Sequence, residues 1–222
     1  ASAEFVYEAL NLRNPALIKG IHSSSLAAGA TVLTTNTFAA NSAELALAGV
    51  GNQTTEINKA AVQIAREAIS EYQIEFSEQG GSFFVIGSIG PGGDDIETYE
   101  SQINALIDSN VDALLLETFT NIDLAMQITE SISNRTDAPL VIVHGALDPG
   151  VGENQRWPME PSEFATRAAA AGAAVAGINC VAPWVAADFV ESAKQAPAVK
   201  SGELLLSAMP NAGGFERIGH RF

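Results

Sequence analysis

The sequence predicts an α/β fold built on a parallel β-sheet, and three observations support this class. Helix-like and strand-like segments alternate along the 222 residues, so a helical pattern separates each strand run from the next. The strand runs are apolar nearly throughout rather than alternately apolar and polar, which is typical of parallel strands buried on both faces. No short hairpin signal such as Asn-Gly joins neighbouring strands.

The helices are predicted from the spacing of apolar residues and from residues that favour helix ends. Asn14 and Pro15 form a suitable cap and first-turn pair ahead of the first helix, and Gly29 ends it. In chain order, the helical patterns cover residues 17–28, 54–72, 99–109, 122–132, 162–171 and 183–193.

The strands are predicted from six runs rich in apolar and β-branched residues. The first run, "TVLTTNTF", is uninterrupted, and the second, "FFVIGSIG", follows a polar break that is rich in glycine. In chain order, the strands cover residues 31–38, 83–90, 112–120, 139–147, 175–182 and 204–209.

Six parallel strands suit either a doubly wound sheet or a (β/α)8 TIM barrel that lacks two strands. A nucleotide-binding doubly wound fold would carry a G-x-G-x-x-G turn or a phosphate-binding loop after a strand, and the sequence has neither. The string "GSIGPGG" at residues 87–93 is rich in glycine but precedes no clear helix start. We therefore predict the barrel.

The composition argues against several classes of function. Hydrophobic residues make up 47% of the chain and charged residues 17%, which allows a sizeable core. The formal net charge of -15 repels phosphate backbones and anionic lipid, so we expect no nucleic-acid partner and no membrane partner. One cysteine cannot form an internal disulfide, which fits a reducing compartment. We expect a soluble, cytoplasmic protein.

Polar residues stand at or just past the carboxyl end of each predicted strand. In parallel α/β folds the carboxyl ends of the strands meet at one edge of the sheet, and ligands bind at that edge. We therefore expect a binding site there. Its candidate residues, in chain order, are Asn36, Ser88, Glu117, His144, Asn179 and Asn211.

Five short strings occur at successive strand ends and in a fixed order along the chain. They are "AGATVLTTNTFAAN" (28–41), "GSIGP" (87–91), "LLLETFTNIDLA" (114–125), "GINC" (177–180) and "MPNAG" (209–213). Together they resemble the homocysteine S-methyltransferase family, which includes betaine–homocysteine methyltransferase, S-methylmethionine-dependent enzymes and the homocysteine domain of cobalamin-dependent methionine synthase. The resemblance spans about residues 10–222.

The resemblance implies a (β/α)8 barrel that binds zinc through three cysteine thiolates at the barrel mouth. Homocysteine's sulfur would complete the coordination as a thiolate, because zinc deprotonates a bound thiol, and would accept a methyl group to give methionine. The methyl donor would be an onium compound or a folate or cobalamin carrier. The transfer requires no covalent enzyme intermediate, and no residue of this chain is assigned as a catalytic acid or base.

The resemblance also assigns roles to individual residues. Cys180 matches the family's first zinc cysteine, and Glu117 matches the carboxylate that receives the ammonium group of homocysteine. Asn36 and Asn179 match polar positions that line the pocket, and Ser88 lies at an equivalent strand end.

Two family segments do not occur in these 222 residues. One is the Gly-Gly-Cys-Cys-Gly segment of the last strand, which carries the other two zinc cysteines, and the other is the first strand with its acidic, glycine-containing turn. We therefore expect residues 1–222 to be a single homocysteine-binding barrel domain that lacks its first and last strands. Further domains or a homo-oligomer remain compatible with the sequence.

Other readings of the sequence lead to different functions. Cys180 could be a buried core residue or, with His144, a nucleophile, although no oxyanion motif accompanies that pair. The chain could be a truncated, metal-free barrel that binds a small amino acid through Glu117 without catalysis. A metal-independent lyase-like barrel is disfavoured because no predicted strand ends in lysine.

Overall fold

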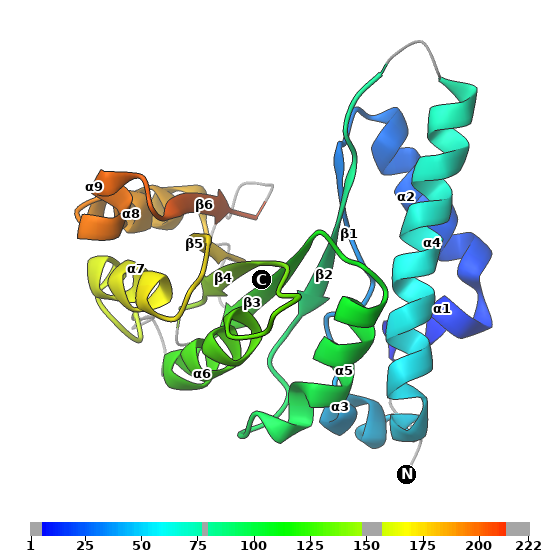
Figure 1. Ribbon diagram of the computed structural model, residues 1–222, viewed down its shortest axis with the longest axis horizontal. Coiled ribbons are helices and arrows are strands. Elements are labelled where there is room, and N and C mark those ends of the chain that lie inside the picture. The colour runs from blue at the N-terminus through cyan, green and yellow to red at the C-terminus, as the bar shows by residue number, and fades with distance from the viewer. Residues whose placement is uncertain (1–5, 77–79, 148–156, 212–222) are drawn as a thin grey trace, which may run out of the picture.

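The chain folds into a curled parallel sheet with helices packed around its outer side (Figure 1). The structure, a computed structural model, describes residues 6–76, 80–147 and 157–211. The strands are β1 (Val32–Thr34), β2 (Phe84–Ile89), β3 (Ala113–Phe119), β4 (Leu140–Gly145), β5 (Val175–Asn179) and β6 (Leu205–Met209). The α-helices are α1 (Leu10–Arg13), α2 (Pro15–Ala27), α3 (Ser42–Leu47), α4 (Thr54–Glu75), α5 (Glu97–Asp108), α6 (Ile122–Ser133), α7 (Pro161–Ala170), α8 (Pro183–Ala193) and α9 (Pro197–Ser201). Two short 3-10 helices are η1 (Tyr7–Ala9) and η2 (Gly51–Gln53).

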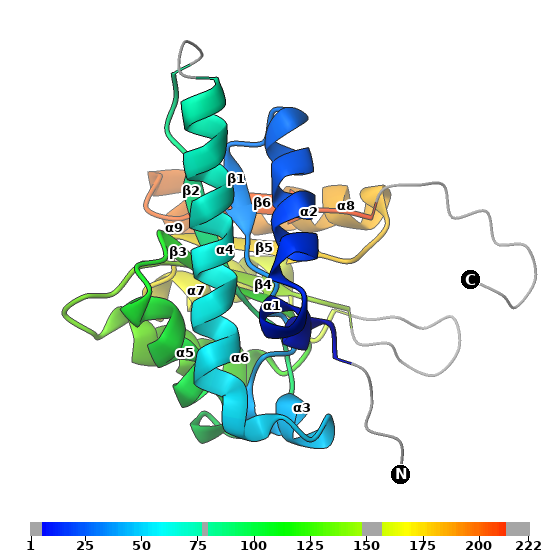
Figure 2. The same ribbon diagram turned by 90° about the vertical axis from the view of Figure 1, so that its right-hand side faces the viewer.

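The strand order distinguishes between the two predicted architectures. The strands lie in the order β1-β2-β3-β4-β5-β6, and each pairs in parallel with the next one along the chain. A doubly wound sheet reverses direction at a switch point, whereas this sheet never does. Because right-handed crossovers that always step the same way place their helices on one side, the sheet curls like part of a barrel (Figures 1 and 2).

The two faces of the sheet are buried to different extents. A Cβ on Gly87 would lie 3.0 Å from Leu106 of α5, so this position faces the helices. Because side chains alternate along a strand, Phe84 and Ser88 face the opposite side. We call that opposite side the concave face. Phe84, Leu140 and Leu205 are exposed at its amino-terminal end. The expectation that both faces of every strand are buried is therefore wrong for the described residues, because the described helices cover only the outer face.

The first strand is shorter than the eight residues that its β-branched run predicts. β1 ends at Thr34, and two threonine hydroxyls then take over the contacts with β2. Thr35 Oγ1 accepts a hydrogen bond from the Ser88 amide at 3.1 Å, and Thr37 Oγ1 donates to the Ser88 carbonyl at 2.7 Å. Side chains thus replace ladder hydrogen bonds, which Ser and Thr hydroxyls do at strand and helix ends.

Three short α-helices, α1, α3 and α9, were not predicted from the sequence. Each has six residues or fewer, which is too short to show helical spacing of apolar residues. Asn41 caps α3, with its side chain accepting a hydrogen bond from the Glu44 amide at 3.0 Å. The last two residues of the "MPNAG" string lie outside the described residues.

A buried histidine spans three strands on the concave face. His144 of β4 is 1% exposed and shares a 2.5 Å hydrogen bond with Ser207 Oγ of β6. Gly177 of β5 lies between them in the register of the sheet. A Cβ at Gly177 would lie 2.7 Å from His144 Nε2 and 2.3 Å from the Ser207 carbonyl oxygen. Glycine is therefore required here for the two side chains to meet.

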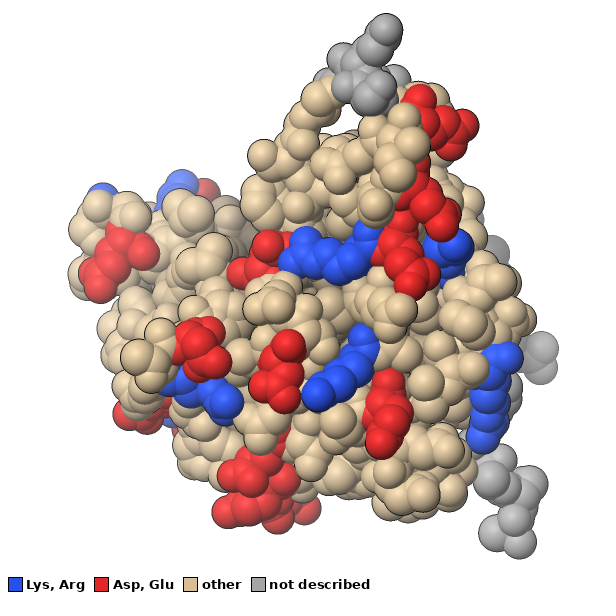
Figure 3. Space-filling model, turned by 45° about the vertical axis from the view of Figure 1, so that its right-hand side comes forward, with Lys and Arg blue, Asp and Glu red and all other residues tan. Residues whose placement is uncertain are grey.

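Several lysine and arginine side chains on the face shown in Figure 3 lie beside acidic side chains. Lys19 pairs with Glu71 at 2.7 Å, and Arg66 pairs with Asp112 at 2.9 Å. These pairs are exposed to solvent, so they contribute little to stability. Within the described ranges, no helix combines the length and hydrophobicity that crossing a membrane needs.

We expect Gly177→Ala to destabilise the fold, because its methyl group would overlap the Ser207 carbonyl and separate His144 from Ser207. Overpacking of this kind costs about 1–3 kcal/mol of unfolding free energy. The control is Gly20→Ala in α2, where nothing lies within 4 Å of the added Cβ. Gly20→Ala should stabilise the helix by about 0.5–1 kcal/mol. Urea unfolding of both variants checks the prediction, and equal stabilities would contradict it.

We also expect the fold to lose stability as the pH falls below about 6.5. Burial lowers the pKa of His144 to about 4. Between about pH 6.5 and pH 4 the unfolded chain therefore binds a proton on this histidine, whereas the folded chain does not. The effect reaches about 3 kcal/mol near pH 4. Burial also lowers the pKa of His22. His144→Gln should flatten the dependence of the unfolding free energy on pH between pH 4 and 7. His22→Gln should keep the part of that dependence that comes from His144. An unchanged profile in His144→Gln would refute the assignment.

Candidate functional site

Glu117 is at the centre of a polar cluster at the carboxyl ends of the strands. It lies near the end of β3 and is half-buried. Its Oε1 accepts a 2.5 Å hydrogen bond from Ser88 Oγ of β2, and its Oε2 accepts a 3.0 Å hydrogen bond from Asn179 Nδ2 of β5. Both donors are almost completely buried. The structure therefore brings together three of the predicted site residues.

Burial raises the pKa of the Glu117 carboxyl above its usual value, and the hydrogen bonds from Ser88 and Asn179 oppose that shift. Removing a carboxylate from water disfavours its charged form, whereas donors aimed at its oxygens favour it. Donors cannot neutralise the charge as a cation would. A bound ammonium group would supply that missing positive charge.

The orientation of the Asn179 amide is fixed by its neighbour across the sheet. Its Oδ1 accepts a hydrogen bond from the Thr118 amide at 3.0 Å, so its Nδ2 must point towards Glu117 and towards Thr118 Oγ1, 2.9 Å away. Asn179 thus contacts β3 although β4 lies between them in the sheet order. Side chains can bridge alternate strands in this way because the sheet is curled and they lie on its concave face.

Thr118 belongs to the cluster, although it was not predicted from the sequence. The pairing of β3 with β4 shifts register between Leu116 and Phe119, and Thr118 adopts a φ of 65°. A positive φ is unusual for a β-branched residue and is typical of functional sites. In a regular strand Thr118 would face away from Glu117, but here its hydroxyl reaches Asn179 and donates to Cys180 Sγ at 3.8 Å.

Cys180 follows β5 at the rim of the cluster. It is exposed among the described residues, so the described part of the chain does not bury it in a core. Its φ of 58° turns the chain out of the strand, and Asn179 Nδ2 lies 3.6 Å from its sulfur. Among the described residues, no group of three or more His, Cys, Asp or Glu side chains is placed to hold a metal ion.

Two further polar strand-end residues, Asn36 and Asn211, have hydrogen-bond partners outside this cluster. Asn36 follows β1, where its Nδ2 donates to the Tyr7 carbonyl and to Asn11 Oδ1, both at 3.0 Å. These two hydrogen bonds tie the end of β1 to the N-terminal helices. Asn211 is exposed beyond β6, and its amide donates to the Val181 carbonyl at 2.9 Å.

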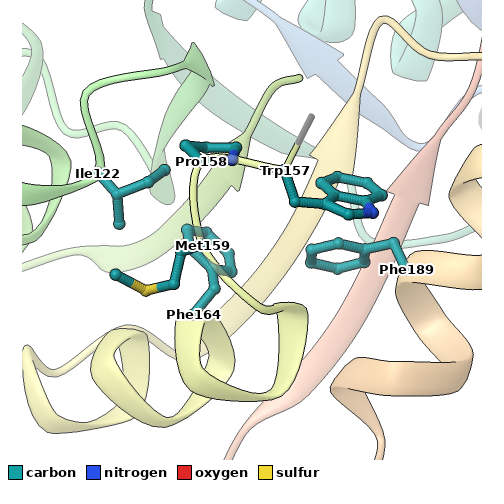
Figure 4. Close-up of a pocket in the computed structure, with 7 residues that line it drawn as sticks. Ile122, Trp157, Pro158, Met159, Phe164 and Phe189 are labelled. Carbon is teal, nitrogen blue, oxygen red and sulfur yellow. The ribbon is translucent and has the colours of Figure 1, made fainter. Parts of the chain in front are cut away.

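A small apolar pocket lies on the helix-covered side of the sheet, opposite the face that carries the cluster. Trp157, Met159, Phe164 and Phe189 line it, together with Ile122, Gly145 and Pro158. The rings of Trp157 and Phe189 lie 5.2 Å apart, centre to centre (Figure 4). No charged side chain lines this pocket, and Phe164 and Phe189 belong to the core between sheet and helices. We interpret it as a packing gap under residues 157–160.

Comparison with solved structures identifies the fold. The metallated form of the homocysteine methyltransferase MmuM from Escherichia coli superposes with a TM-score of 0.81 at 21% sequence identity, covering 96% of this chain and 78% of that chain. Its apo form gives a TM-score of 0.71 at 19% identity and covers 93% of this chain and 84% of that chain. At these identities the likeness concerns the fold.

Comparison with curated proteins and family models identifies the family. Betaine–homocysteine S-methyltransferase 1 of Danio rerio is 27% identical over 186 residues, and that of Rattus norvegicus is 26% identical over 184 residues. These alignments cover 75% and 76% of this chain but 41% of each relative, so the chain spans about two fifths of their length. A model of the homocysteine S-methyltransferase family matches residues 2–221. The chain therefore belongs to the homocysteine S-methyltransferase family.

Proposed function

We propose that this protein binds homocysteine at the carboxyl ends of its strands and takes part in the methylation of homocysteine sulfur. The observation that carries the proposal is the half-buried Glu117 carboxylate, held by Ser88 and Asn179 beside the exposed Cys180 thiol. Membership of the homocysteine S-methyltransferase family supports the same substrate.

In this proposal Glu117 receives the ammonium group of homocysteine. Each of its oxygens already accepts one hydrogen bond, and a carboxylate oxygen has lone pairs for more than one donor. The attraction between ammonium and carboxylate is strengthened by burial, because less water screens it. Burial also raises the pKa of Glu117, so homocysteine affinity should fall in acid at a higher pH than an exposed glutamate would give.

The cluster also places the carboxylate near a sulfur. Asn179 Nδ2 is 3.0 Å from Glu117 Oε2 and 3.6 Å from Cys180 Sγ. One side-chain nitrogen thus contacts both groups, so an amino acid as small as homocysteine can reach from the carboxylate towards Cys180. Methyl transfer would then form a bond between homocysteine's sulfur and the methyl carbon as the bond from carbon to the donor breaks. The donor would be an onium compound or a folate or cobalamin carrier.

We further propose that Cys180 is one thiolate ligand of a zinc ion. Its sulfur is exposed, lies at the site and belongs to a residue type that zinc prefers. The described residues do not form a zinc site on their own, because Cys180 is the single cysteine of the 222 residues and belongs to no described group of three or more metal-binding side chains. Three-cysteine ligation would thus need two thiolates from outside this sequence. A solved structure of MmuM is described as metallated, which is consistent with this assignment.

The proposal includes a closed (β/α)8 barrel. The concave face carries exposed Phe84, Leu140 and Leu205, which a closed barrel would bury in its interior.

A second candidate function, a metal-free protein that binds a small amino acid without catalysis, is favoured by one observation. Glu117 and both of its donors are complete within the described residues, whereas the metal site is not.

We expect Glu117→Gln to weaken homocysteine binding at least 10-fold, because the amide cannot neutralise the ammonium group and charged hydrogen bonds contribute about 1.5–3 kcal/mol. Isothermal titration with homocysteine at neutral pH measures the effect. Glu130→Gln, an exposed carboxylate on α6, is the matched control and should bind like the parent protein. Equal affinities in Glu117→Gln and Glu130→Gln would remove Glu117 from its proposed role.

In a protein that also supplies the two further thiolates, we expect Cys180→Ser to abolish zinc retention while the fold is kept, because Cys180 is exposed. Zinc content per protein, measured by atomic emission after desalting, checks this, with the thermal midpoint as the test of folding. The metal-free alternative predicts no stoichiometric zinc in the parent protein. Zinc bound equally by parent and variant would exclude Cys180 as a ligand.

A further inference from the structure

Gln102 is a fully buried polar side chain on the otherwise apolar buried face of α5. It is 0% exposed and lies between Tyr99, Ile103 and Leu106, which belong to the hydrophobic core. A buried amide costs stability unless it is hydrogen-bonded. Its Nε2 donates to the Thr37 carbonyl at 2.6 Å and to the Ser88 carbonyl at 3.3 Å. The helix thus reaches the end of β2 through one side chain.

The backbone of Ser88 is held by side chains on both of its peptide groups. Its amide donates to Thr35 Oγ1, and its carbonyl accepts from Thr37 Oγ1 and Gln102 Nε2. Ordinary ladder pairing is missing on this side because β1 ends at Thr34. On its other side Ser88 pairs with Leu115 of β3, so these three side chains fix its position on the β1 side of the strand.

The position of Ser88 affects the position of Glu117, because the two side chains are hydrogen-bonded. Its hydroxyl donates to Glu117 Oε1 at 2.5 Å, and hydrogen bonds weaken when the distance and angle between donor and acceptor change. We propose that Gln102 is a positioning residue that sets the Glu117 carboxylate for ammonium binding by holding Ser88 in place. This inference rests on the proposed role of Glu117 in binding homocysteine.

A second buried amide provides a control for a purely structural role. Asn58 of α4 is also 0% exposed, and its Nδ2 donates to the carbonyls of Ala40 and Thr54 at 2.9 and 2.7 Å. Within the described residues, the side-chain oxygens of Asn58 and Gln102 are both buried without a hydrogen-bond partner. The two residues differ in that Asn58 has no hydrogen bond to Ser88 or Glu117.

The experiment compares Gln102→Met with Asn58→Leu, two near-isosteric changes that each remove a buried amide. Homocysteine affinity is measured by isothermal titration and stability by the thermal midpoint. We expect both variants to melt at lower temperature, but only Gln102→Met to bind homocysteine 5- to 10-fold more weakly. Parent-like affinity in Gln102→Met, or equal losses in both variants, would overturn the inference.

A double-mutant cycle tests whether Gln102 acts through Ser88. In a Ser88→Ala background the hydroxyl that contacts Glu117 is gone, so adding Gln102→Met should change the affinity less than 2-fold. The same 5- to 10-fold loss in both backgrounds would contradict an action through Ser88. If Gln102→Met does not fold, Thr37→Val, which removes the other side-chain donor to the Ser88 carbonyl, takes its place with the same expected results.

The outcome also separates this inference from the proposed function. A parent protein that does not bind homocysteine, or binds it equally well as Glu117→Gln, refutes the proposed function and with it the role of Gln102. A parent protein that binds homocysteine through Glu117, with unchanged affinity in Gln102→Met, refutes the positioning role alone.

Discussion

A half-buried carboxylate that no described cation neutralises is the constraint on which the site depends. Glu117 loses hydration at the end of β3, and a buried charge is tolerated only when donors replace the lost water. Those donors come from β2 and from β5, on either side of β3 but at different distances in the sheet. Asn179 has to cross β4 to reach it. The site therefore requires the curl of the sheet, and a flat sheet with the same strand order would leave Glu117 with one donor.

Residues of the concave face that precede the site along the strands also hold strands β4, β5 and β6 in their relative positions. Beneath Asn179, the absence of a side chain at Gly177 lets His144 join Ser207 and so links β4 with β6 across β5. The hydrogen bond between His144 and Ser207 thus crosses β5 at Gly177, two residues before Asn179 and three before Cys180, which both belong to the site. The buried imidazole stays neutral at physiological pH, because burial lowers its pKa to about 4, and so adds no charge beneath the carboxylate.

The sequence predicted the strands and the edge of the sheet where the site lies, because apolar runs and strand-end polar residues are local signals. It assigned Glu117, Ser88, Asn179 and Cys180 to one place, and the structure brings them together. Thr118 escaped prediction because its participation depends on a register shift between β3 and β4 that no local pattern encodes. Gln102 lies on a helix, fifteen residues before Glu117, and only packing shows that it reaches β2.

The two halves of the site differ in what the described residues supply. Glu117 has a donor for each oxygen, so the ammonium-binding half is complete, whereas the sulfur half offers the single thiol of Cys180. Binding of an amino group and activation of a thiol are therefore separable, and amino-acid binding alone cannot distinguish a methyltransferase from a metal-free binding protein. Both would use the same carboxylate. Activation of the thiol requires a metal ion that binds the deprotonated sulfur, whereas binding of the amino acid alone requires no metal. The metal content of the protein is therefore the property that distinguishes a methyltransferase from a metal-free binding protein.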